Sequence, residues 1–309
     1  MSPPGSSSPT RTRRDRCPGA LRPWHAEDGL LVRLRLIGGR ISARSLLALA
    51  GVADEYGTGR IHVTGRANVQ LRALPGREGR LDPEVLEALQ RTGLLPSLTH
   101  ELARNVMASP CTGLLGEKTG AEGTPSGSPG QGGRADLRPV AAALDESLCA
   151  TPQLAALPGR FLFVLDDGRG DLLERSCDLG LVALDEHVAQ LRLGEGWGPL
   201  TPLNQAPAAL VRFAEEFLAR RGDGATAPWH IAELPSPLTD PAPPDPRLPA
   251  PAPPPPYGPL PEGGRHVPVP DEGLARPTTE ALAEEALASG AGELIVTPWR
   301  GVLVPGETQ

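Results

Sequence analysis

The sequence predicts an α+β protein in which one strand-helix-strand-turn-strand unit occurs twice, on either side of a larger α/β region. The first observation is an internal repeat. An offset of 233 residues (297 − 64) aligns LAGVADEYGTGRIHVTGRANVQL with LAEEALASGAGELIVTPWRGVLV without a gap. The second is that the helical pattern of each copy ends at Gly-x-Gly and leads into short β-branched strands. The third is a proline-rich stretch that precedes the second copy.

The first copy contains every element of the unit. The segment GLLVRLRLI alternates apolar residues with Arg33 and Arg35, which predicts a half-buried strand whose arginines face solvent and tolerate replacement by alanine. Ser42 is expected to cap a helix over residues 43–56, and a strand, a polar turn and a second strand follow over residues 57–74. This order is a ferredoxin-like half, which needs a second half to complete its sheet.

The region between the copies predicts an α/β module. Helix patterns start at Asp82, near Val140 and at Ala206, and apolar strands cover residues 160–165 and 181–184. Two adjacent aspartates, Asp166 and Asp167, follow the first of these strands. They are compatible with a metal site, but Asp-Asp-Gly between strands favours ordinary turn chemistry.

Composition divides the chain into five segments. They are a disordered tail (1–20), the first ferredoxin-like half (21–75), the α/β module (76–234), a proline-rich linker (235–270) and the second ferredoxin-like half (271–309). The linker holds 16 of the 37 prolines, which favours a semi-rigid polyproline spacer. Residues 116–133 predict a flexible loop, and Thr278 or Thr279 is expected to cap a helix over residues 280–289. Whether the two halves pair within one chain stays open.

Charge and composition narrow the classes of partner. The net charge of −7 argues against nucleic-acid binding. No apolar run approaches the roughly 20 residues of a membrane span, and no signal peptide is recognisable, so we expect a cytoplasmic protein without membrane contact. Lys118 is the sole lysine, so nearly all positive charge is guanidinium, which suits forked recognition of carboxylates. Genome composition is the alternative explanation for any single arginine.

Six motifs, in order, resemble the nitrite and sulfite reductase superfamily and, within it, the precorrin-3B synthase subfamily of cobalamin biosynthesis. They are GLLVRLRLIGGRIS, YGTGRIHVTGRANVQLR, ARNVMASPCTGL, LPGRFLFVLDDGRGDL, CDLGL and TPWRGVLVPG. The resemblance covers about residues 17–305. It implies ferredoxin-like halves alternating with α/β modules of the nitrite/sulfite reductase type. It also implies a tetrapyrrole ringed with carboxylates, bound as sirohaem or as the substrate.

The same resemblance implies the residues that bind the tetrapyrrole. Arg66 and Asn68 match the tetrapyrrole-facing turn of the family, Arg104 and Asn105 match its second anion-binding element, and Arg160 matches a basic position at the start of a strand. Forked guanidinium contacts would orient the carboxylates of such a macrocycle. Surface arginines at strand ends are the alternative for each of them.

Two positions depart from these patterns. Arg300 is a further candidate, but it is displaced by one position relative to Arg66 in the repeat, so it is expected to face a different side. Leu162 stands where the sirohaem reductases carry a second basic residue, which weakens a reductase interpretation. No catalytic residue and no metal ligand is assigned.

The cysteines do not follow the family pattern. The [4Fe-4S] ligands of the family come in two cysteine pairs after TPWR, and none of Cys17, Cys111, Cys149 and Cys177 matches them. The resemblance therefore implies a [4Fe-4S] cluster together with sirohaem or non-haem iron. The cysteine ligands of that cluster are not present in this chain. We expect a separate cluster-bearing C-terminal half and an electron donor as partners. The chain is expected to be a fragment, a frameshift product or one half of a split enzyme.

The function that follows from the resemblance is a precorrin-3B synthase-like oxidoreductase, an oxygen-dependent monooxygenase of cobalamin biosynthesis. Two alternatives remain. One is a sirohaem-dependent nitrite or sulfite reductase. The other is a non-catalytic tetrapyrrole-binding or assembly protein.

Overall fold

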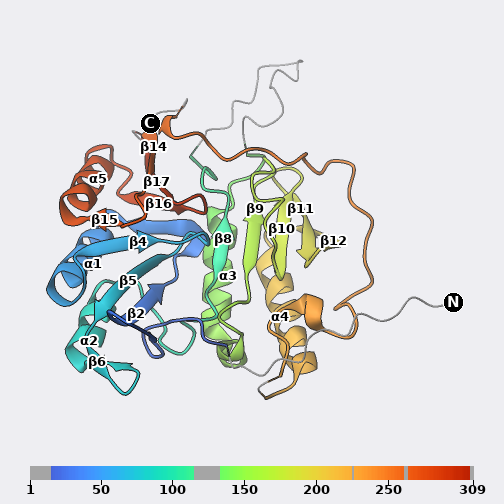
Figure 1. Cartoon of the computed structure of the whole chain (residues 1–309). Coiled ribbons are helices and arrows are strands. Elements are labelled where there is room, and N and C mark those ends of the chain that lie inside the picture. The colour runs from blue at the N-terminus through green and yellow to red at the C-terminus, as the bar shows by residue number, and fades with distance from the viewer. Residues whose placement is uncertain (1–14, 115–132, 225, 261–263, 307–309) are drawn as a thin grey trace.

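A computed structural model describes residues 15–114, 133–224, 226–260 and 264–306 (Figure 1). Most of the predicted N-terminal tail and nearly all of the predicted loop over residues 116–133 lie outside these ranges. The described residues form helices and three five-stranded sheets, so the predicted α+β class is confirmed. Among them, no helix is long and apolar enough to cross a bilayer.

The first ferredoxin-like half follows the predicted order. Its elements are β1 (Trp24–Ala26), β2 (Gly29–Leu34), a 3-10 turn (Ile37–Gly39), β3 (Arg40–Ser42), α1 (Ala43–Tyr56), β4 (Arg60–Val63) and β5 (Val69–Leu74). A short hairpin of β6 (Gly76–Arg77) and β7 (Arg80–Leu81) then leads to α2 (Pro83–Arg91). Helix α1 has the predicted bounds, and the Ser42 hydroxyl accepts a hydrogen bond from the Ser45 amide at 3.0 Å, which is the expected cap.

The second half repeats these elements. They are β13 (Gly258–Pro259), β14 (Gly264–Pro268), β15 (Leu274–Ala275), α5 (Arg276–Ala288), β16 (Glu293–Thr297) and β17 (Gly301–Pro305). The predicted cap at Thr278 or Thr279 is wrong, because α5 starts earlier, with Pro277 in its first turn. Thr279 lies inside the helix and donates its hydroxyl to the Ala275 carbonyl.

The two halves pair within this chain by exchanging strands. The first sheet has the order β1-β2-β5-β4-β15, and the second has the order β13-β14-β17-β16-β3. One edge strand of each sheet therefore comes from the other half. Leu274 pairs with Ile61, and Leu294 pairs with Ile41. The repeat offset converts one pair into the other (294 − 61 = 233; 274 − 41 = 233). The exchange is therefore symmetric, and it closes one apolar core that contains residues of both halves.

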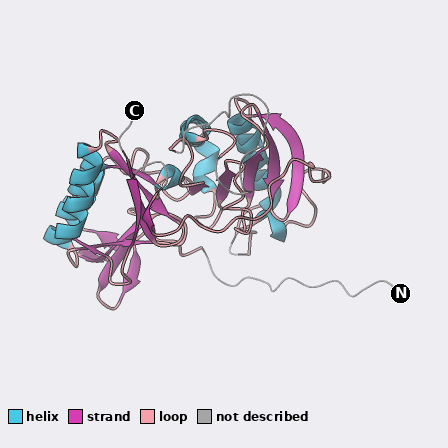
Figure 2. Ribbon diagram, turned by 90° about the horizontal axis from the view of Figure 1, so that it is seen from above, coloured by secondary structure: helices cyan, strands magenta, loops and turns pink. Residues whose placement is uncertain are grey.

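The α/β module lies beside this pair of sheets. It contains β8 (Val106–Ala108), α3 (Arg138–Ala150), a 3-10 turn (Pro152–Ala156), β9 (Phe163–Asp166), β10 (Leu179–Ala183), β11 (Val188–Leu193), β12 (Gly196–Pro202), α4 (Ala206–Arg221) and a 3-10 turn (Ile231–Glu233). Its sheet has the order β12-β11-β10-β9-β8, with β8, β9 and β10 parallel. Strands β11 and β12 were not predicted. Figure 2 shows the helices of the ferredoxin-like pair on the side of their sheets that faces away from the module.

The proline-rich segment is bound along the module rather than free of it (Figure 1). The Gln190 side chain donates to the Pro243 carbonyl and accepts from the Asp245 amide, and the Ala252 amide donates to the Gly170 carbonyl. Strands β13 and β14 begin inside the predicted linker range, 235–270. The linker is shorter than predicted because residues 264–268 keep enough backbone amides to pair with β17.

Candidate functional site

The turn between β4 and β5 carries the first predicted site residue. The Thr64 hydroxyl accepts from the Asn68 amide at 3.2 Å, and the Thr64 amide donates to the Asn68 carbonyl at 2.9 Å. Ala67 takes a positive φ of 55°, which closes the turn. The turn directs Arg66 toward the α/β module, where its Nη1 donates to the Arg160 carbonyl at 3.0 Å. Arg66 and Arg160, both predicted to bind the tetrapyrrole, therefore meet at the junction of the first half and the α/β module.

Two further arginines lie at the same junction. Arg33 on β2 is half-buried, and Arg35, just after β2, is 3% exposed. The prediction that both face solvent is wrong, because the segment around Pro18 covers this face of β2. Arg35 Nη1 donates to the Pro18 carbonyl at 3.3 Å. We call Arg33, Arg35, Arg66 and Arg160 the arginine cluster.

The arginine cluster has little negative charge bonded to it. Asp15 approaches Arg160 at 3.9 Å, whereas Arg35 and Arg66 donate to carbonyl oxygens, and Arg33 donates to the amide oxygen of Gln70. Within the described chain, the Nε atoms of Arg33 and Arg35 have no hydrogen-bond partner. Burial lowers the pKa of Arg33 and of Arg66, with a smaller contribution from nearby guanidinium groups, and it lowers the pKa of Arg35 to about 10. The site is thus desolvated, positively charged and short of anionic partners.

Arg160 forms the exposed part of the cluster. Its side chain is 50% exposed, and its guanidinium carbon lies 5.1 Å from the ring centroid of Trp229. This geometry is a cation-π contact, which holds a long side chain in place while it keeps its charge. No sequence pattern pointed to Trp229, which is remote from the motif in the chain and joins Arg160 only through the fold.

Asn68 and Asn105 also come together, but in the interior. Asn68 Nδ2 donates to Asn105 Oδ1 at 3.1 Å, and the other Asn68 atom, Oδ1, accepts from the Leu36 amide at 2.9 Å. Asn105 Nδ2 donates to the Phe161 carbonyl at 3.1 Å. Both side chains are buried. They connect the first half to the start of β9, so their contribution to the site is to position the turn and Arg160.

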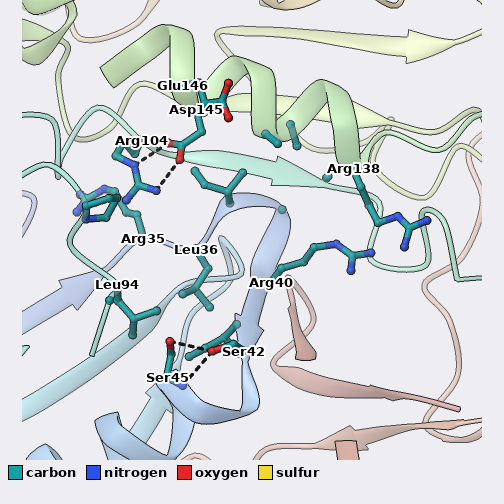
Figure 3. A pocket seen from close by; sticks show the side chains of 18 of the residues that line it. Arg35, Leu36, Arg40, Ser42, Ser45, Leu94, Arg104, Arg138, Asp145 and Glu146 are labelled. Atoms are coloured by element: carbon teal, nitrogen blue, oxygen red, sulfur yellow. Dashed lines mark hydrogen bonds and ion pairs between the residues drawn. The ribbon is translucent and has the colours of Figure 1, made fainter. Parts of the chain in front are cut away.

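Arg104 lies in a different environment (Figure 3). Its Nε and Nη2 donate to the two carboxylate oxygens of Asp145 at 2.6 and 2.8 Å, and its side chain is 7% exposed. This forked pair lies at one end of a pocket of about 420 Å³ between the first half and α3. Figure 3 shows Arg40 and Arg138 at the opposite end. The guanidinium of Arg104 is already neutralised by Asp145, unlike those of the arginine cluster.

Arg300 bonds to a residue of its own half, whereas Arg66 bonds to the module. It takes the positive-φ position (φ 60°) that corresponds to Ala67 in the first half (300 − 67 = 233). Its guanidinium pairs with Asp271 at 2.8 Å, and its side chain is 63% exposed. The position that corresponds to Arg66 is occupied by Trp299.

Among the described residues, the cysteines do not come together as ligands of an iron-sulfur cluster. The one group of three or more possible metal ligands found among them consists of Asp166, Asp167 and Asp171. They do not fit the [4Fe-4S] cluster that the family resemblance implies, because such a cluster requires four thiolates. The prediction of turn chemistry is confirmed for Asp166, whose Oδ1 accepts from the Gly168 and Gly170 amides. Asp171 was not predicted as part of this group.

Known proteins match different parts of the chain. Residues 25–78 match the family model of the nitrite/sulfite reductase ferredoxin-like half domain. A precorrin-3B synthase from Sinorhizobium sp is 42% identical over 62 residues, which is 20% of this chain and 14% of that protein. The NirA protein of Mycobacterium tuberculosis has a similar structure, with a TM-score of 0.63 and 18% identity. The similarity covers 91% of this chain and 54% of the NirA chain.

The two kinds of match carry different weight. The likeness to NirA shows the fold alone at this identity, and the chain spans about half the length of that structure. The family match falls on the half that contains Arg33, Arg35 and Arg66. The expected resemblance is therefore confirmed: residues 25–78 match the nitrite/sulfite reductase ferredoxin-like half domain, a stretch of 62 residues is similar in sequence to a precorrin-3B synthase, and the fold of the chain is similar to that of NirA.

Proposed function

We propose that the arginine cluster binds the carboxylates of a tetrapyrrole, as part of a precorrin-3B synthase-like oxidoreductase of cobalamin biosynthesis. The observation that carries the proposal is the gathering of four guanidinium groups at the junction, none of which is hydrogen-bonded to a carboxylate of the described residues. Hydrogen bonds between guanidinium and carboxylate are strong and directional, and they strengthen where water is partly excluded. A ligand with several carboxylates around a flat ring supplies the missing charge.

Each member of the cluster has a distinct role in this proposal. Arg66 and the exposed Arg160 contact the ligand carboxylates. Arg33, half-buried like Arg66, raises the local positive potential. Arg35 is fully buried and fixes the segment around Pro18. These roles concern binding and orientation, not bond making.

The redox step belongs to groups that the described residues do not hold. The cysteines of the described residues do not fit a [4Fe-4S] cluster, so we assign no electron-transfer step to these residues. Sirohaem is itself a carboxylated tetrapyrrole and would be held by Arg66 and Arg160. When bound, it would supply iron redox chemistry. The oxygen-dependent reaction, the electron donor and a cluster-bearing partner are proposals for the complete enzyme.

Two alternatives remain. A sirohaem-dependent reductase retains the same binding site, but Leu162, where those enzymes carry a basic residue, is 5% exposed and packs with Met107, Val164 and Leu172. A non-catalytic tetrapyrrole-binding or assembly protein is consistent with the scattered cysteines. Purified protein that binds the ring but carries no iron in the presence of its partners would favour the second alternative.

A titration with porphyrins of graded charge tests the proposal. An octacarboxylic porphyrin should bind the full chain more tightly than a dicarboxylic porphyrin with the same ring, and added salt should weaken the difference. Arg66→Ala should reduce affinity for the octacarboxylic ring about tenfold to a hundredfold, which corresponds to the 1.5–3 kcal/mol typical of charged hydrogen bonds. Arg220→Ala, an exposed change on α4, is the matched control. Equal affinity for both porphyrins, or for wild type and Arg66→Ala, would refute the proposal.

A further inference from the structure

A second group of charged side chains lies in the α/β module, at the end of β9. Asp166 and Asp167 are fully buried, and Asp171, in the following turn, is 8% exposed. One carboxylate oxygen from each residue lies within 4.8 Å of the other two. The arginine cluster does not include any of these residues, so this group is independent of the proposed tetrapyrrole site.

The carboxylates of this group outnumber the cations bonded to them. Arg169 is bonded to Asp167, with Nε to Oδ1 at 2.9 Å and Nη2 to Oδ2 at 2.8 Å. Asp166 accepts only backbone amides, and Asp171 Oδ1 accepts from the Ser109 hydroxyl at 2.6 Å. Two carboxyl groups in the interior are thus left without a bonded cation. A carboxylate in such a place is costly unless it takes up a proton or a counter-charge is bound.

One oxygen of the group has no partner. Asp171 Oδ2 is buried and accepts no hydrogen bond from the described residues. Asp171 also lines a pocket of about 420 Å³, together with Glu174, Arg175, Trp299 and the proline run that starts at Pro251. The pocket therefore places a second carboxylate, that of Glu174, on the same wall as Asp171.

We propose that Asp166, Asp167 and Asp171 bind a divalent cation, with Ca²⁺ as the preferred ion and Asp171 Oδ2 as the ligand that the fold leaves open. Ca²⁺ takes oxygen ligands at about 2.3–2.6 Å, so ligands on opposite sides of the ion lie up to about 5 Å apart. A separation of up to 4.8 Å falls within that sphere. Mg²⁺ requires near-octahedral oxygens at about 2.0–2.1 Å and usually keeps several waters, so a group of three buried carboxylates suits Ca²⁺ better.

The test uses the full chain after treatment with a chelator. Ca²⁺ added in calorimetry should bind with one-to-one stoichiometry and raise the thermal midpoint, and Mg²⁺ should bind more weakly. Asp171→Asn keeps the side-chain shape and the acceptor for Ser109, and it should weaken Ca²⁺ binding at least tenfold. Asp185→Asn, which changes an exposed aspartate paired with Arg247, is the matched control and should bind as wild type does.

A luminescent ion locates the site. Tb³⁺ substitutes for Ca²⁺ and is sensitised by a nearby indole, so Trp299 in the pocket should give Tb³⁺ emission that Ca²⁺ displaces. Trp299→Phe should abolish the emission and retain Ca²⁺ binding. No Ca²⁺ binding at about 10 mM, well above the weakest extracellular calcium modules, would overturn the proposal. Equal affinity for wild type and Asp171→Asn would overturn it as well. Either result leaves the tetrapyrrole proposal untouched, because that titration reports on Arg66.

Discussion

The two ferredoxin-like halves have the same backbone and present different chemistry to the α/β module. In the first half the Thr64 hydroxyl accepts from the Asn68 amide at 3.2 Å, and in the second the Thr297 hydroxyl accepts from the Gly301 amide at 3.1 Å. The residue before each of these amides has a positive φ. The turn has therefore been retained in both copies by the same side-chain-to-backbone hydrogen bonds.

The side chains at equivalent positions differ in charge. Arg66 corresponds to Trp299, and Arg33 corresponds to His266 (299 − 66 = 233; 266 − 33 = 233). Arg66 and Arg33 belong to the arginine cluster, whereas His266 packs against Tyr257 and is hydrogen-bonded to Thr297 and Pro255. The comparison teaches that the repeat conserves the fold of the turn, while a few side chains decide which copy can bind an anion.

The largest effect is expected at β4 and β16, the strands that pair with the exchanged strands β15 and β3. Ile61→Ala and Leu294→Ala, at equivalent and fully buried positions, should each lower the free energy of unfolding by about 2–5 kcal/mol, the range for large-to-small core changes. Urea unfolding measures both. Similar losses would support one shared core, and a loss confined to one variant would show that the halves are not equivalent in packing.

Arg104 is expected to affect stability and not ligand binding. Arg104→Ala leaves Asp145 without its forked partner, which should cost about 3 kcal/mol, since breaking a buried ion pair strands one charge. Urea unfolding measures the loss, and titration with the octacarboxylic porphyrin should show an affinity close to wild type. A hundredfold loss of affinity with full stability would return Arg104 to the ligand site.

An exchange between the two turns tests whether position or charge matters. The double variant Arg66→Trp with Trp299→Arg keeps the net charge of the chain and moves one guanidinium to the other half. Binding of the octacarboxylic porphyrin should still fall about tenfold to a hundredfold, because Arg33 and Arg160 remain beside position 66 only. Circular dichroism is the control for folding. Retained affinity would mean that an arginine in either turn can bind the porphyrin carboxylates.

His266 should make the second half sensitive to acid. Burial lowers its pKa in the folded state, so the unfolded chain takes up the proton first as pH falls below about 6.5. Its contribution is present above that pH and is lost progressively below it, at no more than about 1.4 kcal/mol per pH unit. His266→Gln should flatten this part of the pH profile, measured by urea unfolding between pH 7.5 and 5.5. An unchanged slope would contradict this assignment.

Arg300 should have the smallest effect. Its pair with Asp271 is highly exposed, so Arg300→Ala should change the free energy of unfolding by less than about 1 kcal/mol. Porphyrin affinity should stay within error of wild type. A loss comparable with that of Arg66→Ala would show that the second turn also contacts the ligand.

Local patterns determined most of the elements from sequence. The repeat, the bounds of α1, the start of α4 and the Asp-Asp-Gly turn all depend on residues close in the chain, where propensity, capping and spacing act directly. The displacement of Arg300 was also visible, because side-chain direction follows from position in a turn or strand.

Only the tertiary structure decided which charged groups share an environment. Arg33 and Arg35 alternate as exposed residues do, yet the segment around Pro18 covers Arg35. Arg104 and Arg66 occupy adjacent motifs of one family pattern, yet Asp145, on a distant helix, neutralises the first. Asp171 joins Asp166 and Asp167 through the fold of a turn. Burial and charge pairing depend on what packs against a side chain from elsewhere in the chain, and periodicity along the sequence does not encode that neighbour.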